Sequence, residues 1–247
     1  MDRMIYTAMT GAKHVFKQQA GVANNLANVS TTGFRAQEHK FQAAPILSEA
    51  MPTRAFVVDS SVSTKFEEGP LMVTARELDV AVKGKGWLAV QLPDGSEAYT
   101  RAGALDINVN GILQTKSGYT VVGDGGPIAV PPDNKVEIGT DGTVSVVPLA
   151  GTPNNVNAIG RLKLVNPPEA SLTRGEDGLF RLPGGAVADV DPAVKLAPGA
   201  LEGSNVNVAD TMVNLISLSR QFEMQIKLLQ TADANAKSAD QLLSMNA

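Results

Sequence analysis

The stretch Ile5–Leu26 reads IYTAMTGAKHVFKQQAGVANNL, and its apolar and small residues recur alternately three and four residues apart. Only an α-helix brings such positions onto one face, and a repeat of seven is the pattern of a coiled-coil seam. The spacing predicts a helix from about residue 3 to about residue 28, with an exit at Gly33, where glycine tolerates a positive φ. The predicted seam residues, which like those of the second helix below are expected at the interface between subunits, are Ile5, Ala8, Ala12, Val15, Val22 and Leu26.

The C-terminal end of the chain repeats this pattern. Apolar residues recur from Val208 at the same alternating spacing and shift by one residue near Ala232, as at a coiled-coil discontinuity. A helix over this stretch is roughly 50 Å long, at about 1.5 Å per residue. We expect the two terminal helices to pair as a coiled coil, the second one through Met212, Leu215, Phe222, Ile226, Leu229, Ala236 and Leu243.

Between the helices the apolar period falls to two, which indicates half-buried β-strands. It is clearest at Leu78–Val82, Leu105–Val109 and Ile159–Leu164. Tight hairpin turns are indicated where an acidic residue or an asparagine precedes glycine, at Asp94-Gly95, Asn110-Gly111, Asp124-Gly125, Asp141-Gly142 and Asp177-Gly178. The sequence predicts a mixed α and β fold, with a mainly antiparallel β domain, a sandwich or irregular barrel, flanked by the two helices.

The residues between the first helix and the β domain fit neither period. They contain Pro45, Pro52 and small polar residues around an isolated apolar triplet, Phe56–Val58. We therefore expect a discontinuous helical domain (1–35 plus 201–247), an extended connector (36–69) and a β-rich domain (70–200).

The composition excludes several classes of protein. The 247 residues include no cysteine, which rules out disulfides and thiolate metal sites. A net charge of −4 and an aromatic content of 4% argue against a nucleic-acid partner. No stretch is long and apolar enough for a secretory signal or a membrane span, so the default compartment from composition alone is the cytoplasm.

Residues suited to catalysis or ligand binding are few. The only histidines, His14 and His39, are expected on a polar surface without converging partners. The glycine-rich stretch Lys83–Gly86 lacks the spacing of a phosphate-binding loop and indicates a strand connection. We expect no catalytic residue, no cofactor and no metal site.

Three asparagines, Asn24, Asn25 and Asn28, gather near the end of the first helix. They lower helix propensity and are typical of a fraying helix end. Their amides can also fix the register between packed helices, as a buried asparagine does in a coiled coil. Both interpretations stay open, and both can hold together. Because the apolar stripes are narrow, we expect the helices to be fully ordered only against other subunits.

Several segments, in this order along the chain, resemble the flagellar axial proteins of the bacterial rod and hook. The resemblance rests on Ala23–Arg35, on Leu78–Val82 with Gly86, on Tyr99–Gly103, on Gly118-Tyr119, and on Leu201–Val208 followed by the long helix. The chain length suits the two longer rod proteins of that family. Residues 1–12 and 221–233 look most like the proximal rod protein, and the distal rod protein is the alternative.

The resemblance implies a structural, non-enzymatic subunit of the rod, a helical tube that crosses the periplasm and transmits torque. It implies as partners other copies of the chain, other rod proteins along the axis and the flagellar type III export apparatus, with export without a cleaved signal. The implied location, the basal body, replaces the cytoplasmic default. A β-rich extracellular adhesion module is the alternative from another class, but it needs an aromatic-lined groove. A hydrolase that uses scattered carboxylates is a weaker alternative.

Overall fold

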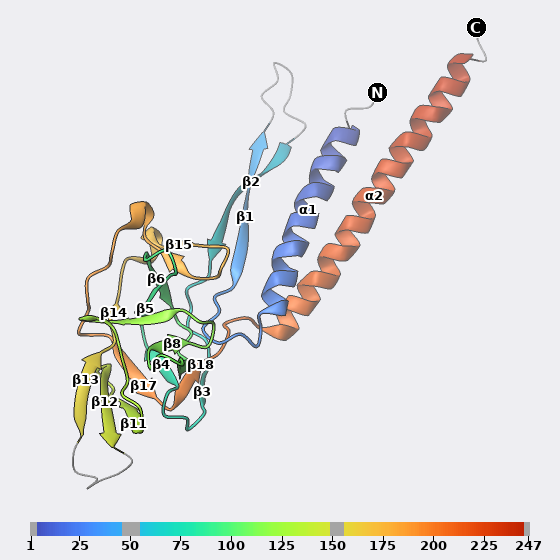
Figure 1. Ribbon diagram of the computed structural model, residues 1–247. Coiled ribbons are helices and arrows are strands. Elements are labelled where there is room, and N and C mark those ends of the chain that lie inside the picture. The colour runs from blue at the N-terminus through green and yellow to red at the C-terminus, as the bar shows by residue number, and fades with distance from the viewer. Residues whose placement is uncertain (1–3, 46–54, 149–155, 245–247) are drawn as a thin grey trace. The chain divides into compact units, whose positions relative to one another are not determined.

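The computed structural model of the chain describes residues 4–45, 55–148 and 156–244. The chain divides into two compact units. We call Met1–Val29, Ala36–Lys65 and Val206–Ala247 the helical unit, and Ser30–Arg35 with Phe66–Asn205 the β-rich unit. Figure 1 labels the elements of each unit. The mixed α and β fold predicted from the sequence is confirmed.

The helical unit contains two helices, α1 (Met4–Ala27) and α2 (Val208–Ser244), which lie side by side (Figure 1). Helix α2 begins where Asn207 caps it: Asn207 Oδ1 accepts hydrogen bonds from the backbone N–H groups of Ala209, at 3.0 Å, and Asp210, at 3.4 Å. Such a cap satisfies N–H groups that have no partner inside the helix. Both helices agree with the predicted bounds to within one or two residues, whereas their coiled-coil geometry stays a prediction.

The expected connector forms a β-hairpin in the helical unit. Strand β1 (Gln37–Pro45) pairs antiparallel with β2 (Ala55–Thr64), with an irregularity between Lys40 and Phe41. The triplet Phe56–Val58 lies in β2, where β-branched and aromatic residues favour strand. Pro45 ends β1, for which the described residues provide β2 as the one strand neighbour, and such an edge position tolerates proline. The segment forms paired strands and groups with the helices.

The β-rich unit is built around a nine-stranded sheet in which the strands follow the order β15-β16-β6-β5-β9-β8-β7. Strand β10 pairs with β9, and β14 pairs with β5. The strands are β5 (Trp87–Gln91), β6 (Glu97–Thr100), β7 (Leu105–Ile107), β8 (Leu113–Thr115), β9 (Thr120–Gly123), β10 (Gly126–Pro127), β14 (Leu164–Val165), β15 (Thr173–Arg174) and β16 (Phe180–Arg181).

Three smaller sheets complete this unit. They are β11 (Asn134–Ile138), β12 (Thr143–Pro148) and β13 (Asn157–Arg161); β4 (Val80–Lys83) with β17 (Lys195–Pro198); and β3 (Leu71–Val73) with β18 (Ala200–Glu202). Two short 3₁₀ helices follow β14 and β16, η1 (Glu169–Ser171) and η2 (Pro183–Gly185). Every strand pair in the described part of the chain is antiparallel, as predicted.

Each predicted turn dipeptide joins two paired strands. The turns connect β5 to β6, β7 to β8, β9 to β10, β11 to β12 and β15 to β16. Positive φ is found at Gly95, Gly111, Gly142 and Gly178, whereas in the turn after β9 it falls on Gly126, one residue later than predicted. The glycine-rich Lys83–Gly86 connects β4 to β5, as the sequence indicated.

The β-rich unit has an aliphatic core and a smaller aromatic one. The aliphatic core includes Val80, Leu88, Leu105, Leu113 and Leu162, none of them exposed to solvent. In the aromatic core, the rings of Trp87 and Phe180 have their centroids 4.6 Å apart. A low aromatic content therefore goes with a core that is mainly Val, Leu and Ile. Among the described residues, no helix is long and apolar enough to cross a membrane.

Candidate functional site

The predicted seam residues of the helical unit differ in burial. Most are half-buried: Ile5, Ala8, Val15, Val22 and Leu26 on α1, and Leu215, Phe222, Ile226, Leu229 and Ala236 on α2. Ala12 is buried and Met212 is exposed, and the side chain of Leu243 lies outside the described residues. The rings of Phe16 and Phe222 have centroids 6.4 Å apart. Gly11 permits close packing, because a Cβ at this position would lie 3.3 Å from the Gln225 side chain.

A second apolar stripe on the helical unit faces solvent. We define the α2 ridge as the residues that recur every four positions, namely Val208, Met212, Ile216, Met224 and Leu228, with Arg220 in the same row. Their side chains are 40% to 59% exposed. On α1, Tyr6, Met9 and Phe16 are also more than half exposed. Met212 was predicted as a seam residue, whereas the rest of the α2 ridge was not identified from the sequence. At about 100° per residue an i, i+4 row winds round the helix, so neighbouring members share a face but Val208 and Leu228 do not.

The three asparagines have different roles in the helical unit. Asn24 is exposed, and its carbonyl oxygen accepts a hydrogen bond from Asn28 Nδ2 at 3.0 Å, which belongs to the helix end. Asn25 is 9% exposed, and its amide pairs with the backbone of Gln37 on β1. The end-of-helix interpretation thus describes Asn28, while Asn25 binds the hairpin of its own chain. A role in register between subunits stays a prediction.

The two histidines also lie in the helical unit and are half-buried. His39 on β1 lies against Gly21 of α1, since a Cβ at Gly21 would come within 2.5 Å of His39 Nε2. Glycine at this position therefore lets the hairpin approach the helix. No group of three or more His, Asp or Glu side chains suited to a metal ion is found among the described residues.

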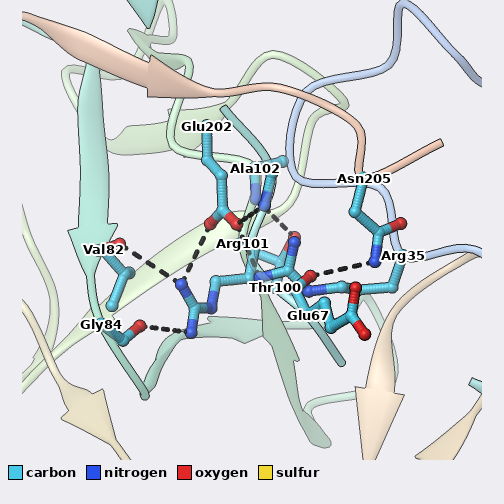
Figure 2. Close-up of polar contacts among 10 residues, drawn as sticks. Arg35, Glu67, Val82, Gly84, Thr100, Arg101, Ala102, Glu202 and Asn205 are labelled. Carbon is cyan, nitrogen blue, oxygen red and sulfur yellow. Dashed lines mark hydrogen bonds and ion pairs between the residues drawn. The ribbon is translucent and has the colours of Figure 1, made fainter. Parts of the chain in front are cut away.

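A buried ionic cluster lies in the β-rich unit (Figure 2). We call Arg35, Arg101 and Glu202 the Glu202 cluster. Arg35 Nη2 lies 2.6 Å from Glu202 Oε1, and Arg101 Nη1 lies 3.0 Å from Glu202 Oε2. The three side chains are at most 4% exposed. Two guanidinium groups share one carboxylate, so the cluster holds a net positive charge away from water.

Arg101 has further partners that fix its position. Its Nη1 and Nη2 donate to the backbone oxygens of Val82, at 3.3 Å, and Gly84, at 2.6 Å (Figure 2). Its guanidinium also lies 5.3 Å from the centre of the Trp87 ring. Burial lowers the pKa of Arg101, an effect that the Glu202 carboxylate opposes. An arginine starts from so high a pKa that the group stays charged at neutral pH.

Backbone contacts join the same segments around the cluster. Gly33 N donates to the carbonyl of Glu202 at 2.8 Å, and Asn205 N donates to the carbonyl of Phe34 at 3.3 Å. Gly69 N donates to Glu202 Oε1 at 2.9 Å. Gly33 has a φ of 69°, and a Cβ on it would lie 2.3 Å from the Arg101 carbonyl carbon. The segment that follows α1 and the segment that precedes α2 are thus hydrogen-bonded to each other.

The carboxylates with perturbed pKa values stabilise turns. The Ser96 and Thr143 side chains donate to Asp94 and Asp141 and lower the pKa of each carboxyl. Arg181 does the same for the pKa of Asp177. A depressed pKa keeps a carboxylate charged as an acceptor, which serves a turn better than proton transfer does.

Comparison with known protein families gives matches over three separate parts of the chain. Three family descriptions match: "Flagella basal body rod protein" over residues 5–35, "Flagellar hook protein FlgE/F/G D1 domain" over residues 81–146, and "Flagellar basal body rod FlgEFG protein C-terminal" over residues 197–242. Each match includes one member of the Glu202 cluster: Arg35, Arg101 and Glu202 respectively.

Curated relatives match over the whole chain. The chain is 44% identical to the flagellar basal-body rod protein FlgF of Escherichia coli (strain K12) and to that of Salmonella typhimurium, with 100% of each chain covered. It is 33% identical to the rod protein FlgG of Buchnera aphidicola subsp. Schizaphis graminum, over 90% of this chain and 92% of that protein. The chain therefore belongs to the FlgF family of flagellar basal-body rod proteins.

Proposed function

We propose that the chain, a structural subunit of the flagellar proximal rod, assembles helically through its helical unit into a tube that transmits torque and encloses the export channel. Family membership supports a place in the basal-body rod. The observation that supports the assembly surface is the exposed α2 ridge. A row of Met, Ile and Leu side chains at helical spacing is normally covered in a finished structure.

The occupant that we propose for the α2 ridge is a second copy of the chain. Full burial of each large apolar side chain on the ridge contributes about 1.5–3 kcal/mol, so Met212, Ile216, Met224 and Leu228 together supply a substantial driving force. An open-ended helical assembly needs two different faces in contact. The exposed residues of α1, which include Tyr6, Met9 and Phe16, offer such a second face.

Charge supports the same arrangement. Helix α1 carries Lys13 and Lys17 and no acidic residue. Helix α2 carries four acidic residues, Asp210, Glu223, Asp233 and Asp240, and three basic ones, Arg220, Lys227 and Lys237, so it has a net charge of −1. The net charges of the two helices are opposite in sign and favour α1 of one copy beside α2 of another, although exposed charges contribute more to the choice of partner than to affinity.

The interface residues predicted from the sequence and the remaining predicted partners also have a place in this assembly. The predicted seam residues lie at the subunit interface, where α1 and α2 pair as a coiled coil, and the α2 ridge, which shares Met212 with the seam, extends that interface to the neighbouring copy. Other rod proteins bind above and below along the axis. The subunit reaches the rod through the flagellar type III export apparatus, without a cleaved signal.

A complementation experiment tests this proposal. Basal bodies from a strain that lacks the gene are imaged, and we expect a rod that stops near its base. Restoring the wild-type gene should restore the rod and swimming. A complete rod in the deleted strain would contradict the proposal.

A further inference from the structure

We infer that the Glu202 cluster is a mechanical clamp, which keeps the segment after α1 and the segment before α2 locked to the core of the β-rich unit. The inference about the clamp depends on the contacts alone. Its mechanical role rests on the proposed function, because only a rod subunit carries torque.

The first support is the number of chain segments that meet at one carboxylate. Glu202 lies at the end of β18 and contacts Arg35 from the segment after α1, Gly69 before β3, and Arg101 after β6. Asn205 Nδ2 donates to the Glu67 carbonyl at 2.9 Å, a contact that joins the same segments (Figure 2). Loss of this single carboxylate would therefore remove contacts to three segments of the chain at once.

The second support is the dependence of Arg35 on Glu202. Its side chain is 0% exposed, and its Nε and Nη1 atoms have no hydrogen-bond partner among the described residues. The ion pair with Glu202 is thus the charged contact that compensates for burial of this guanidinium. Arg174 contacts both Arg35 and the residue before it. Its guanidinium lies 4.5 Å from the centre of the Phe34 ring, and its Nη1 donates to the Arg35 carbonyl at 2.6 Å.

The third support is that the three side chains come from distant parts of the chain. Arg35 follows α1, Arg101 follows β6 and Glu202 ends β18. A force that pulls on the chain at residue 30 or at residue 206 acts first on the hydrogen-bonded pairs Gly33–Glu202 and Phe34–Asn205. It acts on the strands of the core only after these pairs have opened. Glu202 belongs to the first of these pairs through its backbone and to the cluster through its side chain, so the ion pairs of the cluster oppose separation of the two segments.

Amide hydrogen exchange on the full chain tests the clamp. In Glu202→Gln, the amides of Gly33, Gly69 and Asn205 should exchange at least about tenfold faster than in the wild type, because local opening becomes easier. The amides of Leu113 and Leu162, which bond within the core, should not change. Unchanged exchange at the three clamp amides would overturn the inference.

Arg35→Met is the second variant, which keeps the test decisive if Glu202→Gln unfolds the whole unit. It leaves Glu202 paired with Arg101, so we expect faster exchange at Gly33 and Asn205 while Gly69 stays protected. The matched control is Glu97→Gln, which breaks the partly buried pair with Lys163 in the same unit and should leave all three clamp amides unchanged. Equal effects of Arg35→Met and Glu97→Gln on these amides would also overturn the clamp.

The mechanical role is tested in cells that lack the gene and carry each variant. Arg35→Met should give rods in normal number by imaging, but swimming that falls more steeply than wild type as the medium is made more viscous. Glu97→Gln should follow the wild type. Opened amides with wild-type swimming at every viscosity would overturn the mechanical role. Failure of the wild-type gene to restore rods would instead contradict the proposed function. In that case the hydrogen-exchange result would still show whether the Glu202 cluster holds the two segments together.

Discussion

Asn25 on α1 pairs with both backbone groups of Gln37 on β1. Its Nδ2 donates to the Gln37 carbonyl at 2.8 Å, and its Oδ1 accepts from Gln37 N at 2.9 Å. The amide therefore takes the place that a residue of an adjacent strand would take. Because β1 has β2 as its only strand neighbour among the described residues, this contact attaches the start of the hairpin to the helix.

The first prediction concerns this attachment. In Asn25→Asp an oxygen replaces Nδ2 and faces the Gln37 carbonyl, so the pair becomes repulsive. We expect a loss of about 1–3 kcal/mol in the stability of the helical unit, with faster hydrogen exchange at Gln37. Asn24→Asp is the matched control, since Asn24 is exposed one position earlier. Equal effects of the two substitutions on Gln37 would contradict the attachment.

A second prediction concerns Gly33. Alanine in a left-handed conformation costs about 1–2 kcal/mol, and at Gly33 the new Cβ would also collide with the backbone of Arg101. Gly33→Ala should therefore destabilise the β-rich unit more than Gly118→Ala does, because Gly118 has a φ of 89° with open space around it. Urea unfolding followed by fluorescence of the single tryptophan, Trp87, reports this unit. Equal losses would show that close packing at Gly33 is unimportant.

The third prediction separates the seam from the α2 ridge. Ile226→Asp places a charge at a half-buried seam position and should weaken the helical unit of the isolated chain. It should also stop rod assembly, since a charge that is buried there without a partner costs several kcal/mol. Leu26→Asp should do the same from α1. Met224→Asp, on a side chain that is 59% exposed, should leave helix content unchanged and still stop assembly. Circular dichroism and basal-body imaging measure the two effects, and normal rods in Met224→Asp would exclude the ridge as an interface.

The fourth prediction is a pH dependence. Burial raises the pKa of Tyr99 from 10.0 to about 12, so an unfolded chain releases the phenol proton at lower pH than the folded chain does. The contribution of this group to stability is fully present below pH 10.0 and is lost as the pH rises toward 12. Stability should therefore fall more steeply over this range in the wild type than in Tyr99→Phe. Parallel slopes in urea unfolding would contradict the assignment.

Local patterns in the sequence predicted much of this fold. The helices follow from apolar spacing, and turns such as Asp141-Gly142 follow from backbone preferences of single residues. The hairpin around Phe56–Val58 did not emerge as paired strands, because its strands are separated by prolines and its support comes partly from Asn25 and Gly21 on another element. Periodicity describes one element at a time and gives no information on such contacts.

The candidate site was only partly accessible from sequence. The seam residues were predicted because they repeat, and their place at an interface stays a prediction. The α2 ridge has a regular i, i+4 spacing within the same helix. Arg35, Arg101 and Glu202 carry no local signal as a cluster, since a charged residue in a sequence is usually solvated. Their burial together arises only when distant segments meet.

The paired segments Gly33–Phe34 and Glu202–Asn205 also have a topological consequence. The chain leaves the β-rich unit at residue 36 to form the hairpin of the helical unit and returns at residue 66, and the ends of the long returning stretch are adjacent, since Asn205 is hydrogen-bonded to Glu67. Domains whose ends are adjacent can be exchanged or resized without moving the elements on either side. Residues 66–205 are thus an insert whose size can change while the helices and the hairpin are kept.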